Sequence, residues 1–285
     1  MRFRIGFPLF FLVSMMCLDA AADPQHGLRL ESQAVTTASA GAKVHVIAET
    51  PESAEPAKAV PMDVSAENDS DDGNAVVMPG PLRTIVIDPG HGGTNEGAIG
   101  VAGIHEKYLT LQIALLLADR LRKSMPDVQI VLTRQKDQGI SLAERIEMAN
   151  NLKADLFLSL HFNSSTNPEA IGFESFWVGD YWASDMEKSG IEITDEIRSE
   201  RERAATLGER MANQFNRAMR HRFDVLDRGV KPGDYTVLTR AEVPAVVLEM
   251  GFLSHAQEGL ELVTPATRAR IVDALVDAVR GYAGN

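Results

Sequence analysis

The sequence predicts an α/β fold in which helices cover both faces of a mostly parallel, twisted sheet. Short apolar segments rich in β-branched residues alternate with longer segments whose apolar residues recur at helical spacing. The short segments are almost continuously apolar, as expected for parallel strands that are buried on both faces. This alternation begins near residue 82 and contains no internal repeat, so we expect a single domain over residues 82–285.

The elements can be assigned in chain order from this periodicity and from capping residues. Ser141 and Glu144 form a capping box, which predicts the start of a helix. Thr264 provides an N-cap for the closing helix, and the proline after it suits the first helical turn. The predicted strands cover residues 84–88, 128–133, 156–162, 172–178 and 245–251. The predicted helices cover residues 106–123, 141–153, 199–222 and 264–282.

Residues 1–22 have the pattern of a secretory signal peptide. Arg2 and Arg4 precede an apolar run over residues 5–18, and three alanines ending at residue 22 provide a cleavage site. The run is shorter than the roughly 20 apolar residues that a membrane span requires. We therefore expect an exported chain without a membrane span in its mature form. Its expected location is the periplasm, or otherwise the medium or the cell wall.

Residues 23–81 are predicted to form a disordered, acidic linker. This segment is rich in Ala, Glu, Asp, Ser and Pro and contains the acidic run at residues 67–72. Such a composition buries too little apolar surface to offset the entropy lost on ordering. The whole chain has a formal net charge of -12, which excludes nucleic acid as an expected partner because such proteins need an excess of Lys and Arg.

Polar residues with catalytic potential fall where the predicted strands end. His91 follows the first strand, His161 ends the third, Glu249 lies near the end of the strand over residues 245–251, and Glu106 opens the first helix. The carboxyl ends of parallel strands meet at one edge of a sheet, where loops line a common crevice. Two histidines and a carboxylate that leave one position open are a usual catalytic zinc site. The pattern alone leaves a plainer interpretation open, since a glutamate at a helix start also stabilises the helix dipole.

Six sequence blocks resemble one enzyme family in order and spacing. They are IVIDPGHGG (85–93), GIHEKYLTLQIALLLADRL (103–121), IVLTRQKDQGISLAERIEMAN (130–150), ADLFLSLHFNSS (154–165), GFESFWV (172–178) and VLTRAEVPAVVLEMGFLSH (237–255). Over essentially all of residues 83–282 the chain resembles the N-acetylmuramoyl-L-alanine amidases of the amidase-3 family. The resemblance implies that His91, Glu106 and His161 bind one zinc ion per chain, and that Glu249 is catalytic.

The reaction implied by this resemblance is hydrolysis of peptidoglycan, for cell-wall remodelling or daughter-cell separation. The bond cleaved joins the lactyl group of N-acetylmuramic acid to the L-alanine that begins the stem peptide. Zinc polarises a carbonyl and lowers the pKa of a bound water to about 7, while a nearby carboxylate transfers protons. Apolar residues flank Glu249, and desolvation by such neighbours raises the pKa of a carboxyl group. We expect the domain to act as a monomer.

Two other functions fit part of the pattern. A glycosidase would use Glu106 and Glu249 as paired carboxylates, but that mechanism requires no histidine. A family member that binds the cell wall without cutting it would not need an intact set of ligands and base. Asn163, two residues after His161, is a candidate substrate-binding residue or a loop cap.

The connection over residues 179–199 is a candidate regulatory segment. It is longer than the roughly 2 to 6 residues that a strand-to-helix link usually takes, and it contains several carboxylates. In related amidases, an inserted helix in this region can cover the active site until a protein activator displaces it. Two interpretations therefore stand side by side: a solvated connector, or a lid in which Glu187 or Glu192 lies nearest the metal.

Overall fold

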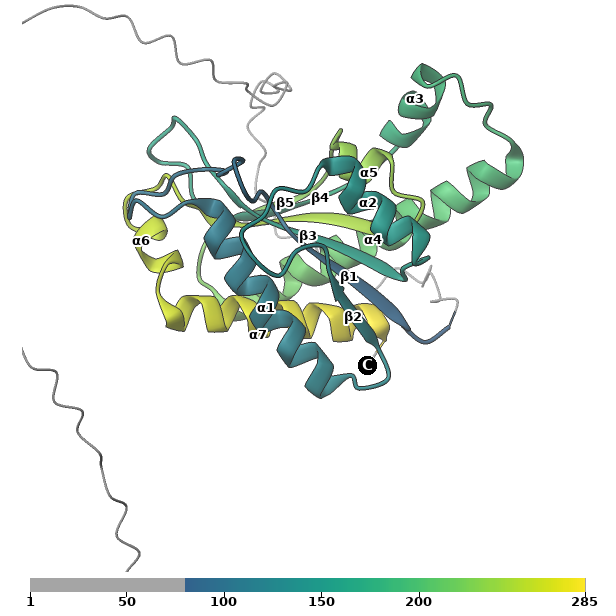
Figure 1. Ribbon diagram of the computed structural model, residues 1–285. Helices are drawn as coiled ribbons and strands as arrows, with labels where there is room; N and C mark the ends of the chain where they lie inside the picture. Colours follow the sequence, from purple (N-terminus) through teal and green to yellow (C-terminus); the bar gives the residue numbers. More distant parts are fainter. Residues whose placement is uncertain (1–79, 285) are drawn as a thin grey trace, which may run out of the picture. The chain divides into compact units, whose positions relative to one another are not determined.

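A six-stranded sheet forms the centre of the folded region (Figure 1). The structure is a computed structural model of the 285-residue chain, and it describes residues 80–284. The predicted signal peptide and almost all of the predicted linker lie outside the described residues. The strands lie in the order β2-β1-β3-β6-β4-β5. They are β1 (Thr84–Pro89), β2 (Gln129–Leu132), β3 (Leu156–Asn163), β4 (Phe173–Trp177), β5 (Asp227–Pro232) and β6 (Ala245–Phe252).

Strand direction divides the sheet into two parts. β2, β1, β3 and β6 are all parallel to one another, whereas β4 pairs antiparallel with β6 and β5 is parallel to β4. The carboxyl ends of the first four strands therefore meet at one edge of the sheet, which we call the carboxyl edge. β4 and β5 begin at this edge and end at the opposite one.

Helices cover both faces, as predicted. One face carries α1 (Glu106–Ser124), α4 (Asp195–Arg222) and α7 (Pro265–Ala283), and the other carries α2 (Leu142–Asn151), α3 (Tyr181–Lys188) and α5 (Thr236–Thr239). A short helix, α6 (Glu258–Leu262), follows β6. In β1, Ile85 and Ile87 pack into the core under α1 and α7, while Val86 packs into the core under α2. Strands buried on both faces explain the continuously apolar segments of the sequence.

Capping residues set the starts of the helices. The capping box of Ser141 and Glu144 is present, and the Thr264 hydroxyl accepts a hydrogen bond from the backbone of Thr267. The hydroxyl of Thr194 caps α4 in the same way, so this helix begins at Asp195, four residues before the predicted start at residue 199. The connection after β4 is accordingly shorter than the sequence indicated, and it contains α3.

Four elements were not predicted: β5 and the short helices α3, α5 and α6. β5 (DRGVKP) contains charged residues, a glycine and a proline, and it has neither the continuous nor the alternating apolar pattern of a strand. As the edge strand next to β4, it needs only one paired side, so its composition is tolerated. None of the helices within residues 80–284 combines the length and the apolar character that crossing a membrane would demand.

Candidate active site

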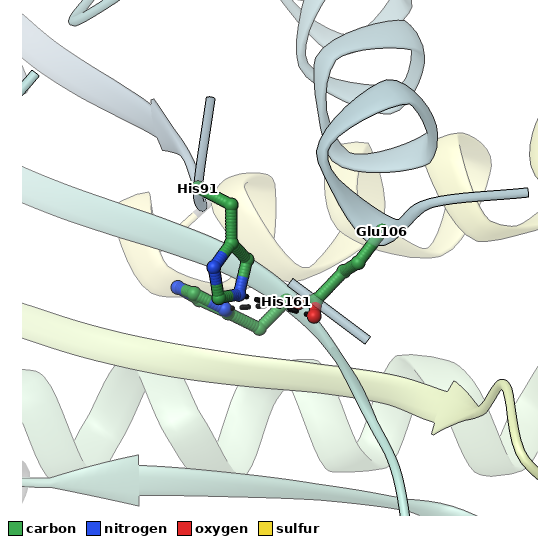
Figure 2. Close-up of side chains that lie close together, drawn as sticks. All are labelled: His91, Glu106 and His161. Carbon is green, nitrogen blue, oxygen red and sulfur yellow. Dashed lines mark hydrogen bonds and ion pairs between the residues drawn. The ribbon is translucent and has the colours of Figure 1, made fainter. Parts of the chain in front are cut away.

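Three side chains from separate elements converge at the carboxyl edge (Figure 2). His91 follows β1, His161 lies near the end of β3, and Glu106 is the first residue of α1. The Nε2 of His91 and the Nδ1 of His161 each lie 3.0 Å from an oxygen of the Glu106 carboxylate. One ligand-type atom from each residue lies within 4.8 Å of the others. These three residues form a cluster with the donor set of a metal site, hereafter the His-Glu-His cluster.

The Glu106 carboxylate is buried and held by backbone donors as well as by the histidines. The backbone N–H of Ala98 donates to one oxygen at 2.9 Å, and that of Phe162 donates to the other at 3.0 Å. Burial by itself would raise the pKa of Glu106, but hydrogen bonds and charges of His161 and His91 outweigh it and hold the pKa well below the usual range. The carboxylate is therefore ionised, as a metal ligand must be.

His91 is oriented by its neighbour Asn95. The Nδ1 of His91 and the Oδ1 of Asn95 lie 2.7 Å apart, so the imidazole uses Nδ1 for this hydrogen bond and directs Nε2 at Glu106. A partner on the second ring nitrogen is the usual way in which proteins fix the tautomer of a ligating histidine. Asn95 was not recognised in the sequence, because an asparagine among glycines is an ordinary loop residue.

Two buried arginines hold the loop that carries His91. The Nη1 of Arg145 lies 2.6 Å from the Asp88 carboxylate, and its Nη2 donates to the backbone carbonyl of His91 at 2.7 Å. Arg134 donates to the carbonyl of Gly90 at 2.8 Å. Burial lowers the pKa of Arg134 to about 10, which still leaves it charged at neutral pH. His91 has a φ of +62°, and this network holds it in the left-handed region that non-glycine residues seldom adopt.

Comparison with known proteins identifies the family. The amidase-3 family model, described as N-acetylmuramoyl-L-alanine amidase, matches residues 85–281. The chain belongs to this amidase family. It is therefore an N-acetylmuramoyl-L-alanine amidase, and the resemblance found in the sequence motifs is confirmed.

Characterised relatives and solved structures agree with this assignment. The amidase is 37% identical over 180 residues to the sporulation-specific N-acetylmuramoyl-L-alanine amidase of Bacillus subtilis, covering 63% of this chain and 60% of the relative. It is 31% identical over 228 residues to the amidase AmiA of Escherichia coli, covering 71% of this chain and 77% of the relative. The crystal structure of an N-acetylmuramoyl-L-alanine amidase from Clostridium difficile 630 superposes with a TM-score of 0.59 at 28% identity, covering 72% and 99% of the two chains.

Glu249 of the amidase lies beside the His-Glu-His cluster. It pairs in register with His161 on β3 and with Glu174 on β4. The residue is half-buried, but its Oε2 is shielded from solvent and has no hydrogen-bond partner among the described residues. Burial raises the pKa of Glu249 well above its ordinary value, and the negative charges of Glu106 and Glu174 add to this effect. A shielded, unpaired carboxyl group with a raised pKa is suited to proton transfer.

Asn163 is already engaged with a protein group in the amidase. Its Nδ2 donates to the buried carboxylate of Glu174, and its Oδ1 accepts from the backbone N–H of Ser164. Asn163 therefore links the end of β3 to β4. Contact of Asn163 with substrate stays a prediction. Glu174 was not predicted as a site residue, because nothing in the local sequence distinguishes a buried carboxylate from an exposed one.

The segment after β4 does not cover the site in this structure. β4 is antiparallel to β6, so residues 179–199 leave the sheet at the edge opposite the His-Glu-His cluster. Figure 1 shows α3 far from α6, which follows the carboxyl end of β6. Trp182 anchors α3 in the core, while Glu187 and Glu192 are exposed. Of the two interpretations of this segment, the direction of β4 favours the solvated connector over a lid with Glu187 or Glu192 nearest the metal.

Two glycines allow the chain to pass close to the cluster. A Cβ atom on Gly90 would lie 2.2 Å from the His161 ring, and one on Gly97 would lie 2.6 Å from Oε2 of Glu106. Real Cβ atoms do not approach other heavy atoms so closely, so any side chain here would displace His161 or Glu106. These positions require glycine because of the space that the cluster occupies.

The Gly97→Ala substitution should weaken metal binding by roughly 10- to 100-fold, the range for residues that support metal ligands. The added methyl group would push on Glu106 and His91, whereas Gly103→Ala provides a matched control. Gly103 has nearly the same φ (+70° against +68°) but has no atom within 4 Å of a Cβ. Zinc affinity measured by competition with a chelating dye should fall only in Gly97→Ala. A loss of affinity of the same size in both variants would show that backbone strain, and not crowding, governs this position.

Proposed function

We propose that this amidase is an exported zinc enzyme that cleaves the amide between the lactyl group of N-acetylmuramic acid and L-alanine. In this proposal His91, Glu106 and His161 hold one zinc ion, and Glu249 transfers protons. The observation that carries the proposal is the convergence of two imidazoles and an ionised carboxylate next to a shielded, unpaired carboxyl group. This convergence is supported by the family match over residues 85–281.

The donor set favours zinc on chemical grounds. Two histidine nitrogens and one carboxylate oxygen are the protein ligands of several catalytic zinc sites, and the remaining position is left for water or substrate. A zinc ion held there supplies a Lewis acid that polarises the amide carbonyl. Asn95, Arg145 and Arg134 keep the ligands in place, and such supporting contacts are a regular part of metal sites.

Glu249 supplies the proton transfers that amide hydrolysis needs. Water must lose a proton as it attacks the carbonyl carbon, and the departing nitrogen must gain one before the C–N bond can break. A single carboxylate can accept the first proton and return it to the amine. The position of Glu249 beside His161 in the β3–β6 pair supports this role, because directly paired residues point to the same face of the sheet.

The proposed setting is the cell envelope, with peptidoglycan as the substrate and wall remodelling or daughter-cell separation as the role. The signal-like pattern of residues 1–22 supports export, with the periplasm as the expected location and the wall or medium as alternatives. We propose a monomer. An activator that displaces a lid is not part of the proposal, because residues 179–199 lie at the other edge of the sheet.

The experiment must distinguish the amidase from a glycosidase, which would cleave the glycan strand instead of the amide. Glu106 is bound by both histidines and by two backbone N–H groups, which leaves it poorly placed to protonate a glycosidic oxygen. The family match adds independent support for amide cleavage.

Mass spectrometry of fragments released from purified sacculi should distinguish these reactions. We expect released peptides that begin with a free L-alanine amine, and glycan strands that keep their lactyl carboxylates. A chelator should abolish release, and added zinc should restore it. New reducing sugar ends would indicate a glycosidase, whereas binding to sacculi without any released fragment would indicate a wall-binding protein.

A further inference from the structure

A row of charged side chains crosses the sheet beyond the His-Glu-His cluster. His161 on β3 pairs in register with Glu249 on β6, which in turn pairs with Glu174 on β4. Arg228 lies on the next strand, β5, opposite the part of β4 that contains Glu174. The register of the β4–β5 pair shifts there, between Phe173 and Ser175. Residues paired directly across neighbouring strands point to the same face of a sheet. The row therefore runs from the cluster through Glu249 to a group of charges on β4 and β5.

Two cations share the single carboxylate of Glu174. The Nζ of Lys231 lies 2.5 Å from Oε2 of Glu174, and the Nε of Arg228 lies 3.6 Å from the same oxygen. The other oxygen of Glu174 accepts from Asn163. Both oxygens of Glu174 therefore have partners, and the formal charges of the three side chains sum to +1.

Arg228 has donor capacity that the described residues do not satisfy. Its Nε is shielded from solvent without a hydrogen-bond partner, and its Nη1 makes one long contact of 3.4 Å with the carbonyl of Ile171. The guanidinium is held over the ring of Phe252, 4.9 Å from its centre. The side chain of Arg228 keeps 32% of its surface exposed, and an arginine fixed by a ring is well prepared to bind a carboxylate.

The two cations stay accessible to a ligand from solvent. Burial raises the pKa of Tyr235, so its phenol keeps its proton and is a further hydrogen-bond donor near Glu174 and Glu249. Lys231 keeps 42% of its side chain exposed, so its ammonium group remains accessible from solvent.

The distances suit the second residue of a stem peptide. Neighbouring strands lie about 5 Å apart, so Glu174 lies roughly 5 Å and β5 roughly 10 Å from Glu249 along the row. Two extended residues span up to about 7 Å, which is enough to reach the Lys231 ammonium group beside Glu174. The second residue of a stem peptide is a glutamate joined through its side chain, and its α-carboxyl group is either free or amidated.

We propose that Lys231 and Arg228 form a carboxylate-binding subsite for the residue that follows L-alanine in the stem peptide. The inference rests on the proposed function, because it assumes that the scissile amide lies between the His-Glu-His cluster and Glu249. It adds a specificity: the amidase prefers stem peptides whose second residue carries a free carboxylate over those in which it is amidated.

The test compares two soluble muramoyl tripeptides that differ only in this group, carboxylate or carboxamide. The wild-type zinc enzyme should show a higher kcat/KM on the carboxylate by about tenfold, the size of one hydrogen bond to a charged group. In the Lys231→Met variant this ratio should fall toward one. The ratio is informative because a loss of folded or zinc-loaded enzyme lowers the activity on both substrates equally.

Two further variants complete the design. Lys231→Arg keeps the cation and should keep most of the preference. Lys188→Met removes a lysine from the end of α3, at the opposite edge of the sheet, and should leave the preference as in wild type. A wild-type ratio near one, or an unchanged ratio in Lys231→Met, would overturn the subsite. If the wild-type enzyme cleaved neither tripeptide nor sacculi, the proposed function itself would be wrong.

Discussion

The His161→Ala variant should lose its zinc and its amidase activity together. His161 supplies one of the three proposed ligands, and its ring lies against both Glu106 and His91, with the two imidazole centres 4.9 Å apart. A site reduced to one histidine and one carboxylate binds zinc too weakly to keep it through dialysis. Without the metal, the amide carbonyl has no electrophilic partner, so turnover should fall to the background of the assay.

Metal analysis after dialysis and turnover on purified sacculi measure this prediction directly. The change should not unfold the protein, because His161 is only half-buried and sits at the end of β3 rather than in the apolar core. Thermal unfolding of the metal-free proteins should therefore be similar for variant and wild type. His221→Ala, an exposed residue in the last turn of α4, is a suitable control and should retain zinc. One tightly held zinc per chain in His161→Ala would refute the ligand assignment.

The Glu249→Gln variant should keep its zinc and lose roughly 10²- to 10⁴-fold in kcat, the usual contribution of a general base. Glutamine has nearly the same shape but cannot accept the proton of water. The three ligand-type side chains do not include Glu249, which explains why the metal should remain. A variant that has lost its zinc, or one that retains full activity, would contradict the role.

The pH dependence of the wild-type enzyme gives a second test of Glu249. A general base acts only when deprotonated, so kcat/KM should fall as the pH decreases through its pKa. Burial raises that pKa above the ordinary value of 4.5, and the acidic limb should therefore lie at a higher pH than an exposed glutamate would give. The residual activity of Glu249→Gln should lack this limb. An identical limb in the variant would assign it to another group.

Local sequence patterns were sufficient for much of the fold and for the core of the site. The apolar runs and capping residues predicted the strands of the parallel part of the sheet and the long helices, usually to within a few residues. His91 and His161 follow or end apolar strands, and Glu106 opens a helix. Because the carboxyl ends of parallel strands lie at one edge of a sheet, the sequence predicted that these residues meet there. The structure confirms that they meet there. Their roles in zinc binding and catalysis stay predictions that the experiments above address.

The sequence by itself determined the buried strands and the long helices, because burial of an apolar face requires a local periodicity that can be read directly. It also predicted which residues follow the parallel strands. Only the tertiary structure decided the direction of β4, because the same apolar pattern suits a parallel or an antiparallel neighbour. That direction moved residues 179–199 to the opposite edge and put Glu174 beside Glu249. The sequence also did not predict that Arg134 and Glu174 are buried, because their environment is formed by residues distant in the chain.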